Sequence, residues 1–144
     1  MRMKPAMTLD DAKKLMAAAE AEAVRNKWEV VIAILNDGGR IVMVHRMDGA
    51  RPGNDEIAIA KATTSAMTCR PTVVWEKWIE GPHKAYATFP FIAAQGGLPI
   101  IVDGDLIGAI GIGGEVVSGR VSWSPDWRRR GPARRRCPRA GSRR

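Results

Sequence analysis

The chain has 144 residues, enough for one domain with one hydrophobic core, and 45% of its residues are apolar against 26% charged. This balance excludes a fibrous or wholly disordered protein. No run approaches the roughly 18 consecutive apolar positions of a membrane-spanning helix, and the N-terminal residues lead into a polar helix instead of the apolar core of a signal peptide, so we expect a cytoplasmic protein without a membrane partner.

The formal charge of +8 is concentrated at the C-terminal end. Residues 119–144 hold ten arginines and one acid, a net charge of +9, whereas residues 1–118 hold 13 basic and 14 acidic side chains, a net charge of −1. The segment over 119–144 is rich in Arg, Pro, Gly and Ser and has little apolar surface to bury. We therefore divide the chain into a domain over 1–118 and a tail over 119–144, which we expect to be disordered.

Two hypotheses account for the tail. The one we favour is a frameshifted or artificial C-terminus, because Arg, Pro, Gly and Ser with a few Trp is what an out-of-frame reading of GC-rich DNA gives. The alternative is a genuine basic arm for nucleic acid, in which arginines contact phosphates while Trp123 and Trp127 stack on bases. An intact tail in the mass spectrum of protein from its source would refute the first hypothesis.

The first predicted element is a helix over Leu9–Arg25. Thr8 followed three residues later by Asp11 is a variant of the capping box, and the residues after them are rich in Ala, Leu, Lys and Glu. Apolar residues recur at steps of three and four, which gives one face of small residues able to lie close to a sheet: Leu9, Ala12, Met16, Ala19 and Ala23.

Two hairpins follow, separated by helices. Residues 29–36 and 40–47 are short aliphatic runs joined by Asp37-Gly38-Gly39, a hairpin turn signal, and the first run is apolar at nearly every position, which predicts a layer on each face. Asn54 is the expected cap of a helix over 55–69, and a short helix over 72–81 follows Pro71. The second hairpin joins 98–102 to 105–114. This order predicts an α/β/α layered domain around an antiparallel sheet.

Three segments, VVIAILNDGGRIVMVHRMDGA, IAIAKATTSA and AAQGGLPIIVDGDLIGAIGIGG, occur in an order and at spacings that resemble the GlcG/HbpS (DUF336) family. The match extends from about Met7 to Gly114. The resemblance implies an α+β fold of the profilin-like kind, with three α/β/α layers and a five-stranded antiparallel sheet, usually assembled into homo-oligomers. It also implies a charged C-terminal helix after Gly114, and the residues found there depart from that pattern.

The family includes haem-binding partners of sensors, proteins encoded beside glycolate-oxidation genes, and a domain attached to some cobalamin adenosyltransferases. Our leading prediction is a small-ligand-binding protein of the GlcG/HbpS type for a flat anionic ligand, with haem the cofactor favoured by resemblance alone. The alternative is a cofactor-independent lyase or isomerase acting on an aromatic or hydroxy acid in a catabolic pathway, with Lys61, His83 or Glu56 as proton carriers. A third is an interaction module whose oligomer interface uses aromatic residues.

Charged candidates for the ligand site lie on the second strand and the second long helix. Arg46, Met47 and Asp48 match the family's R-M-D-G motif, and an Arg there could hold a carboxylate or a haem propionate, or form a structural pair with Asp48. Lys61 lies on an apolar helix face, where it could act as a base, pair with an anion, or extend its stem to reach water. We expect Arg46 and Lys61 to share one cavity.

The two histidines are His45, expected to be buried on a strand face, and His83, expected in a loop and the better candidate for an axial ligand or acid-base group. Neither histidine is separated from a Cys, Asp or Glu by the spacing that zinc sites show, so no metal site is assigned. Five aromatic residues could line a flat pocket, or instead close the core or an oligomer interface: Trp75, Trp78, Tyr86, Phe89 and Phe91.

Glycines form the last set of candidates. A glycine lets the backbone approach a ligand closely, and amides at such turns bind anions. Tight packing of strands explains the same residues nearly as well. The pattern lacks the Lys and Ser/Thr of a phosphate-binding loop, so we reject a nucleotide site. The glycines proposed to contact the ligand are Gly96, Gly97, Gly113 and Gly114.

Overall fold

The computed structural model of the protein describes residues 3–114. Within these residues, each predicted helix and strand forms within two residues of its expected ends, and a short 3-10 helix, η1, was not predicted. The elements are α1 (Leu9–Arg25), β1 (Val31–Asn36), β2 (Ile41–Arg46), α2 (Asn54–Thr68), α3 (Thr72–Glu80), η1 (Lys84–Thr88), β3 (Gly97–Val102) and β4 (Asp105–Gly113).

The two predicted hairpins join into one mixed α+β domain. β1 pairs with β4, so the strand order is β2-β1-β4-β3 and every pairing is antiparallel. The described residues form four strands where the resemblance implies five, and the profilin-like layout stays a prediction. The expectations for the tail over 119–144 and for a C-terminal helix lie outside the described residues. Within residues 3–114, no helix has the length and apolar character that crossing a membrane requires.

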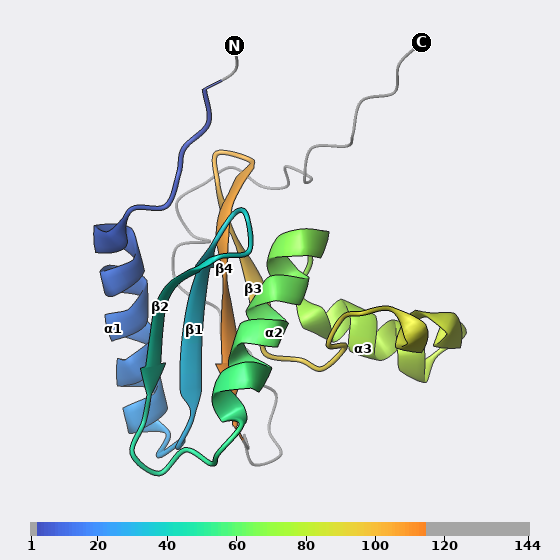
Figure 1. The fold of residues 1–144 in the computed structure, drawn as a ribbon, viewed down its shortest axis with the longest axis horizontal. Helices are drawn as coiled ribbons and strands as arrows, with labels where there is room; N and C mark the ends of the chain where they lie inside the picture. The colour runs from blue at the N-terminus through green and yellow to red at the C-terminus, as the bar shows by residue number, and fades with distance from the viewer. Residues whose placement is uncertain (1–2, 115–144) are drawn as a thin grey trace.

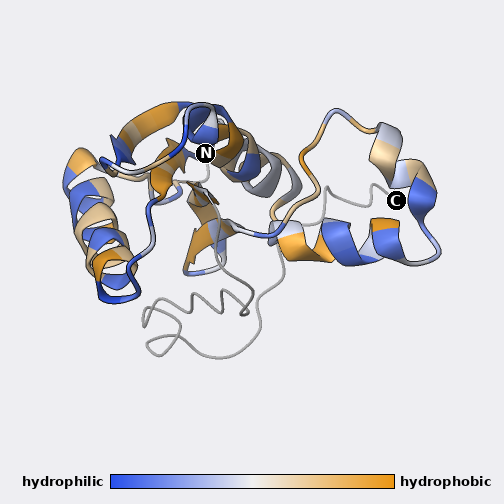
Figure 2. Cartoon of the chain, turned by 90° about the horizontal axis from the view of Figure 1, so that it is seen from below, coloured by the Kyte–Doolittle hydropathy of each residue, from blue (hydrophilic) through white to orange (hydrophobic). Residues whose placement is uncertain are grey.

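Both faces of β1 are covered, as the unbroken apolar run predicted. Ile32 and Ile34 pack with Ala12, Met16, Ala19 and Ala23 of α1, and Val31 and Ala33 pack with Ala58 of α2. Leu9, which was expected on the same face of α1, is 52% exposed. Figure 1 shows α1 along one face of the sheet and α2 along the other. Seen from below in Figure 2, the strands between these helices carry mainly hydrophobic residues. Burial of β1 on both faces is therefore what holds the layers together.

Glycines of β3 and β4 let the backbone of α2 lie directly on the sheet. A Cβ placed on Gly111 would lie 2.1 Å from the carbonyl oxygen of Ala58, and one on Gly113 would lie 2.0 Å from that of Asn54. A Cβ on Gly97 would lie 2.4 Å from the carbonyl oxygen of Lys61. These contacts are with backbone, which cannot rotate away, so the glycines are required by the close approach of α2.

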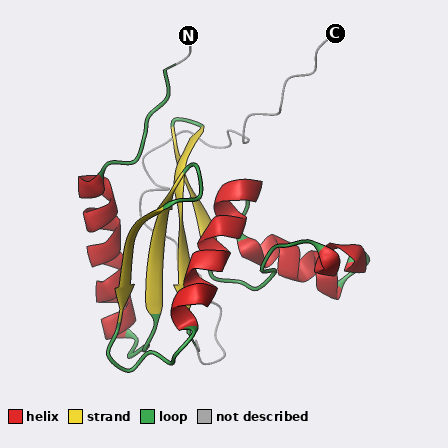
Figure 3. Cartoon of the chain, viewed as in Figure 1, coloured by secondary structure: helices red, strands yellow, loops and turns green. Residues whose placement is uncertain are grey.

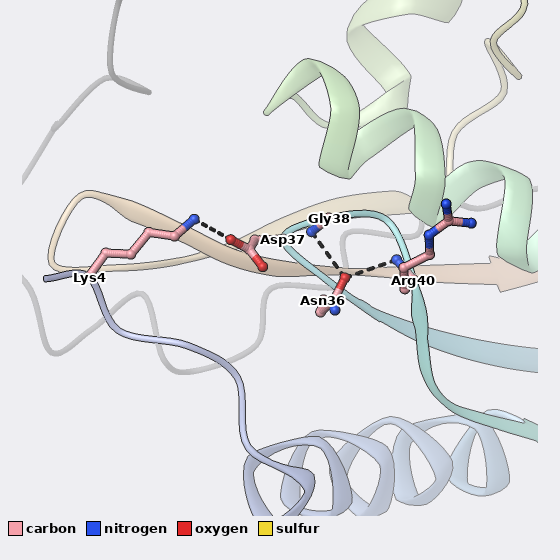
Figure 4. A network of polar contacts seen from close by, with 5 residues as sticks. All are labelled: Lys4, Asn36, Asp37, Gly38 and Arg40. Atoms are coloured by element: carbon pink, nitrogen blue, oxygen red, sulfur yellow. Dashed lines mark hydrogen bonds and ion pairs between the residues drawn. The ribbon is translucent and has the colours of Figure 1, made fainter.

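The N-terminal segment and the first hairpin turn are fixed by polar contacts (Figure 4). The side-chain oxygen of Asn36 accepts from the backbone N–H groups of Gly38, at 3.0 Å, and of Arg40, at 2.9 Å. Lys4 forms an ion pair with Asp37 in the same turn. The predicted turn is therefore confirmed, and the side chain of Asn36 stabilises it.

The expected cap of α2 was wrong by one residue. Gly53 occupies the cap position with φ +84°, and no side chain caps the helix. Asn54 is the first residue of the helix and is buried, because its backbone lies against Gly113. Gly53 adopts the left-handed conformation of the cap position without steric cost, because it has no Cβ.

The capping box of α1 gives a testable prediction. The Thr8 hydroxyl accepts from the Asp11 N–H at 3.2 Å, and the Asp11 carboxylate accepts from the Thr8 N–H at 3.1 Å. The hydrogen bond from the Thr8 side chain lowers the pKa of Asp11. Thr8→Ala should reduce the free energy of unfolding by about 1 kcal/mol in urea titrations at neutral pH.

The matched control for this change is Thr8→Ser, which keeps the hydroxyl and should retain most of the stability. Because the folded pKa of Asp11 is depressed, its contribution is present above the unfolded value near 3.8 and is lost as the pH falls through the folded value. If Thr8→Ala reduced the free energy of unfolding equally at pH 7 and at a pH well below the folded pKa of Asp11, the ionised carboxylate would have no role in the cap.

Candidate functional site

Residues 70–91, which we call the aromatic module, project from the layered domain. Figure 3 shows α3 and η1 lying to one side of the sheet, and Figure 2 shows the same separation from below. The ring of Trp75 is central: its centroid lies 5.2 Å from those of Trp78 and Tyr86 and 5.9 Å from that of Phe91. The Trp75 Nε1–H donates to the Thr68 hydroxyl of α2 at 3.2 Å. The module therefore has a small aromatic core of its own.

The outer part of the module presents an imidazole beside flat rings. The His83 ring is exposed and lies 5.9 Å from the Trp78 ring and 5.7 Å from the Tyr86 ring. The guanidinium of Arg70 lies 5.4 Å from the Trp78 ring centroid, a cation–π contact. Phe89 is 43% exposed next to Tyr86. This surface combines a nitrogen ligand, apolar rings and a positive charge.

Lys61 has its charged group inside the protein. The side chain extends from α2 toward β4, the residue is only 9% exposed, and the ammonium donates to the carbonyl oxygen of Ile112 at 3.2 Å. Burial lowers the pKa of Lys61, and the negative charge of Glu76 opposes that shift. The residue is thus mostly covered, and its three interpretations, as a base, as the partner of an anion or as a stem reaching water, stay predictions.

The segment over 95–97 is held in place next to Lys61. The Gln95 N–H donates to the Glu76 carboxylate at 2.5 Å, and the Gly97 N–H donates to the Thr72 hydroxyl at 2.9 Å. The Ile112 N–H donates to the Gly96 carbonyl at 2.9 Å. Gly96 has φ +118°, and a Cβ there would lie 3.3 Å from the Lys61 Nζ. A glycine is therefore needed at Gly96 for both conformation and space.

A cavity of about 80 Å³ lies at the β3 edge of the sheet. Residues from the start of α3 and from β3 and β4 surround it, and most of them are apolar. Lys61 lies behind this wall, since it contacts Ile112 and approaches Gly96. The lining residues are Pro71, Val73, Gln95, Gly96, Gly97, Leu98, Ile110 and Ile112.

The R-M-D-G corner lies elsewhere. Arg46 ends β2, the strand at the opposite edge from β3, and its guanidinium donates to the carbonyl oxygen of Ala50 at 2.6 Å. Met47 packs against the core on the α1 side, and Asp48 is exposed. The structure does not bring Arg46 to the cavity near Lys61, so the shared cavity that we expected is not found among the described residues.

The remaining candidates are scattered. His45 was expected to be buried, but it is exposed on the edge strand, where its Nδ1 lies 2.5 Å from the Glu20 carboxylate. Glu56 is exposed in the first turn of α2. Gly113 lies under the start of α2, and Gly114 has φ +147° beside Val30. No group of three or more metal-ligating side chains occurs within residues 3–114.

Sequence reasoning missed three residues that the structure places at these sites. Arg70 follows the end of α2 and carries no pattern that predicts its position over Trp78. Glu76 and Thr72 of α3 bind backbone amides 19 and 25 residues further along the chain. Such contacts follow from how α3 packs on β3, so no local signal could have revealed them.

Comparisons with known proteins agree on one family. A family model described as "Haem degrading protein HbpS-like" matches residues 7–119. Protein GlcG of Escherichia coli K12 is 36% identical over 113 residues, which cover 78% of this chain and 84% of that protein. The DUF336 protein ORFY of Klebsiella pneumoniae has a solved structure that superposes with a TM-score of 0.72 at 26% identity, covering 80% of this chain and 83% of that one.

A second solved structure carries a ligand in its name. It is described as a PduOC:Heme complex, and it superposes with a TM-score of 0.71 at 25% identity. The superposition covers 78% of this chain and 86% of that one.

Proposed function

Because the chain belongs to the HbpS-like family, we propose that it binds haem or another flat, anionic tetrapyrrole. Two comparisons support the proposal: the family description names haem, and PduOC is described in complex with heme. The names of these relatives give no support to the alternative of a lyase or isomerase.

We assign the tetrapyrrole to the outer surface of the aromatic module. The observation that carries this assignment is the exposed imidazole of His83 in contact with the rings of Trp78 and Tyr86. Imidazole is a common axial ligand of haem iron, and flat rings pack well on a porphyrin. Arg70, over the Trp78 ring, supplies a guanidinium for a propionate. Haem, when bound, supplies redox-active iron.

The R-M-D-G corner is not part of this proposed site. Arg46 is on β2, and Figure 1 shows β2 on the far side of the sheet from α3. Its contact with Ala50 supports a structural role, because a guanidinium bound to a carbonyl fixes the loop that leads to α2. The homo-oligomer that the resemblance implies stays a prediction, which light scattering would test.

Haemin titration tests the proposal. The wild-type protein should give a saturable shift of the Soret band, and His83→Ala should weaken binding at least about tenfold, a loss of about 1.4 kcal/mol. The matched control is His45→Ala, which removes the other exposed imidazole and should leave the affinity unchanged.

Two results would contradict the proposal in different ways. Absence of a saturable shift in the wild-type protein would remove haem as the ligand. Loss of binding in His45→Ala with normal binding in His83→Ala would keep the function but move the site to β2.

A further inference from the structure

The cavity at the β3 edge is too small for a tetrapyrrole. Its volume is about 80 Å³, whereas pockets for drug-sized ligands start at about 300 Å³. A water molecule takes up about 30 Å³ in the liquid, so the cavity has room for two to three waters or for roughly five non-hydrogen atoms. A ligand of this cavity is therefore a different molecule from the one proposed for the aromatic module.

The charge beside this cavity is positive and incompletely compensated. A lysine ammonium has three N–H donors, and within residues 3–114 Lys61 makes one hydrogen bond, to the neutral carbonyl of Ile112. Glu76 is the nearby acid and its negative charge acts on Lys61, but within residues 3–114 no ion pair joins the two side chains, and the Glu76 carboxylate accepts from the Gln95 N–H. A buried cation without a directly bonded anion is costly, so a negative charge placed close to it, even across one layer of backbone, is stabilised.

The wall between Lys61 and the cavity is made of backbone. The ammonium is bonded to Ile112 and lies close to Gly96, and both residues line the cavity. A Cβ on Gly96 would lie 3.1 Å from the Ile112 carbonyl oxygen and 3.3 Å from the Lys61 Nζ, so the ammonium lies immediately behind the Gly96 backbone. The side chain of Gln95, another lining residue, can donate two further N–H groups.

We propose that this cavity binds a small monocarboxylate, with its charged end toward Lys61 and the Gln95 amide and its short hydrocarbon end among Val73, Leu98 and Ile110. One ammonium matches one negative charge. The apolar lining favours a ligand with a hydrocarbon part over a bare inorganic anion. Because the carboxylate oxygens are two of the roughly five non-hydrogen atoms that fit, the volume limits the ligand to about two or three carbon atoms.

The test is a titration of the full chain with propionate, followed by the backbone amide signals of Gly96, Gly97 and Ile112 in NMR. These signals should shift saturably, and Lys61→Met should raise the Kd at least about tenfold. Methionine keeps the apolar stem and removes the charge, so it should still fold. Lys77→Met is the matched control, because Lys77 is exposed on α3 and absent from the cavity lining.

A neutral probe separates charge from shape. Propionamide has nearly the shape of propionate, and it should bind weakly and equally to the wild-type protein and to Lys61→Met. A second variant, Val73→Phe, fills the cavity from α3 and should abolish the shifts caused by propionate even if Lys61→Met does not fold.

The proposal is overturned if propionate up to about 10 mM leaves the three amide signals unchanged, or if Lys61→Met or Val73→Phe folds and binds propionate as the wild-type protein does. The haemin affinity should be the same in Lys61→Met and in the wild-type protein, so failure of this site is distinguishable from failure of the tetrapyrrole site.

Discussion

Replacing Gly113 by alanine is expected to destabilise the domain by about 3 kcal/mol. The new Cβ would lie 2.0 Å from the backbone oxygen of Asn54 and 2.9 Å from the backbone nitrogen of Ala58. Both atoms belong to α2, so the whole helix would have to move away from β4. That movement would also open the packing of Val31 and Ala33 of β1 against α2. Urea unfolding followed by circular dichroism measures the change.

Gly38→Ala is the matched control for this prediction. A Cβ on Gly38 would meet only the side-chain oxygen of Asn36, at 3.3 Å, in an exposed turn. The stability of that variant should change by less than about 1 kcal/mol. If the two variants were equally stable, α2 would not rest on β4 as closely as described, and Gly113 would be free for the ligand contact that its sequence pattern also allowed.

Truncating the central ring of the aromatic module should have the second large effect. Trp75 is 9% exposed and contacts three other rings, so Trp75→Ala removes the largest part of the module's core. Truncation of a buried Trp costs about 3 to 5 kcal/mol. Since the module has few contacts with the sheet, we expect α3 and η1 to lose their order locally while the sheet remains folded.

Three measurements check this expectation. The near-ultraviolet circular dichroism should fall, amide exchange should accelerate over 72–88 but not in β1 and β4, and haemin binding should be lost with the module. Phe89→Ala is the control, because Phe89 belongs to the same module but is 43% exposed. If Trp75→Ala unfolded the sheet in the same step, the module would be an integral part of the main core.

The helices and strands were predictable because local signals specify them. The Thr8 and Asp11 capping box and the run of small residues predicted α1 with its observed ends, Leu9–Arg25. The turn residues Asp37-Gly38-Gly39 and Asp103-Gly104 predicted both hairpins. The cap of α2 was predicted wrongly because asparagine is a common cap residue. Only the packing of the Asn54 backbone against Gly113 shows why Asn54 lies inside the helix.

The candidate site was harder to predict, because it depends on which strands become edges. Pairing of β1 with β4 places β2 at one edge and β3 at the other. That pairing separates Arg46 from Lys61 and leaves His45 exposed, and no local pattern encodes it. The position of Lys61 on an apolar helix face allowed either a desolvated ammonium or a stem reaching water, and the sequence did not decide between them. The hydrogen bond between Glu76 and Gln95, which lies close to Lys61, forms only when α3 packs beside β3.

The location of the tetrapyrrole is tested most directly by paramagnetic NMR. Ferric haemin broadens the signals of nearby amides, and a gallium porphyrin of the same shape, which is diamagnetic, serves as the reference. We predict broadening of the amides around Trp78, His83 and Tyr86, with the signals of Arg46 and Met47 unchanged. Broadening confined to β2 and the R-M-D-G corner, with the aromatic module unaffected, would contradict the account.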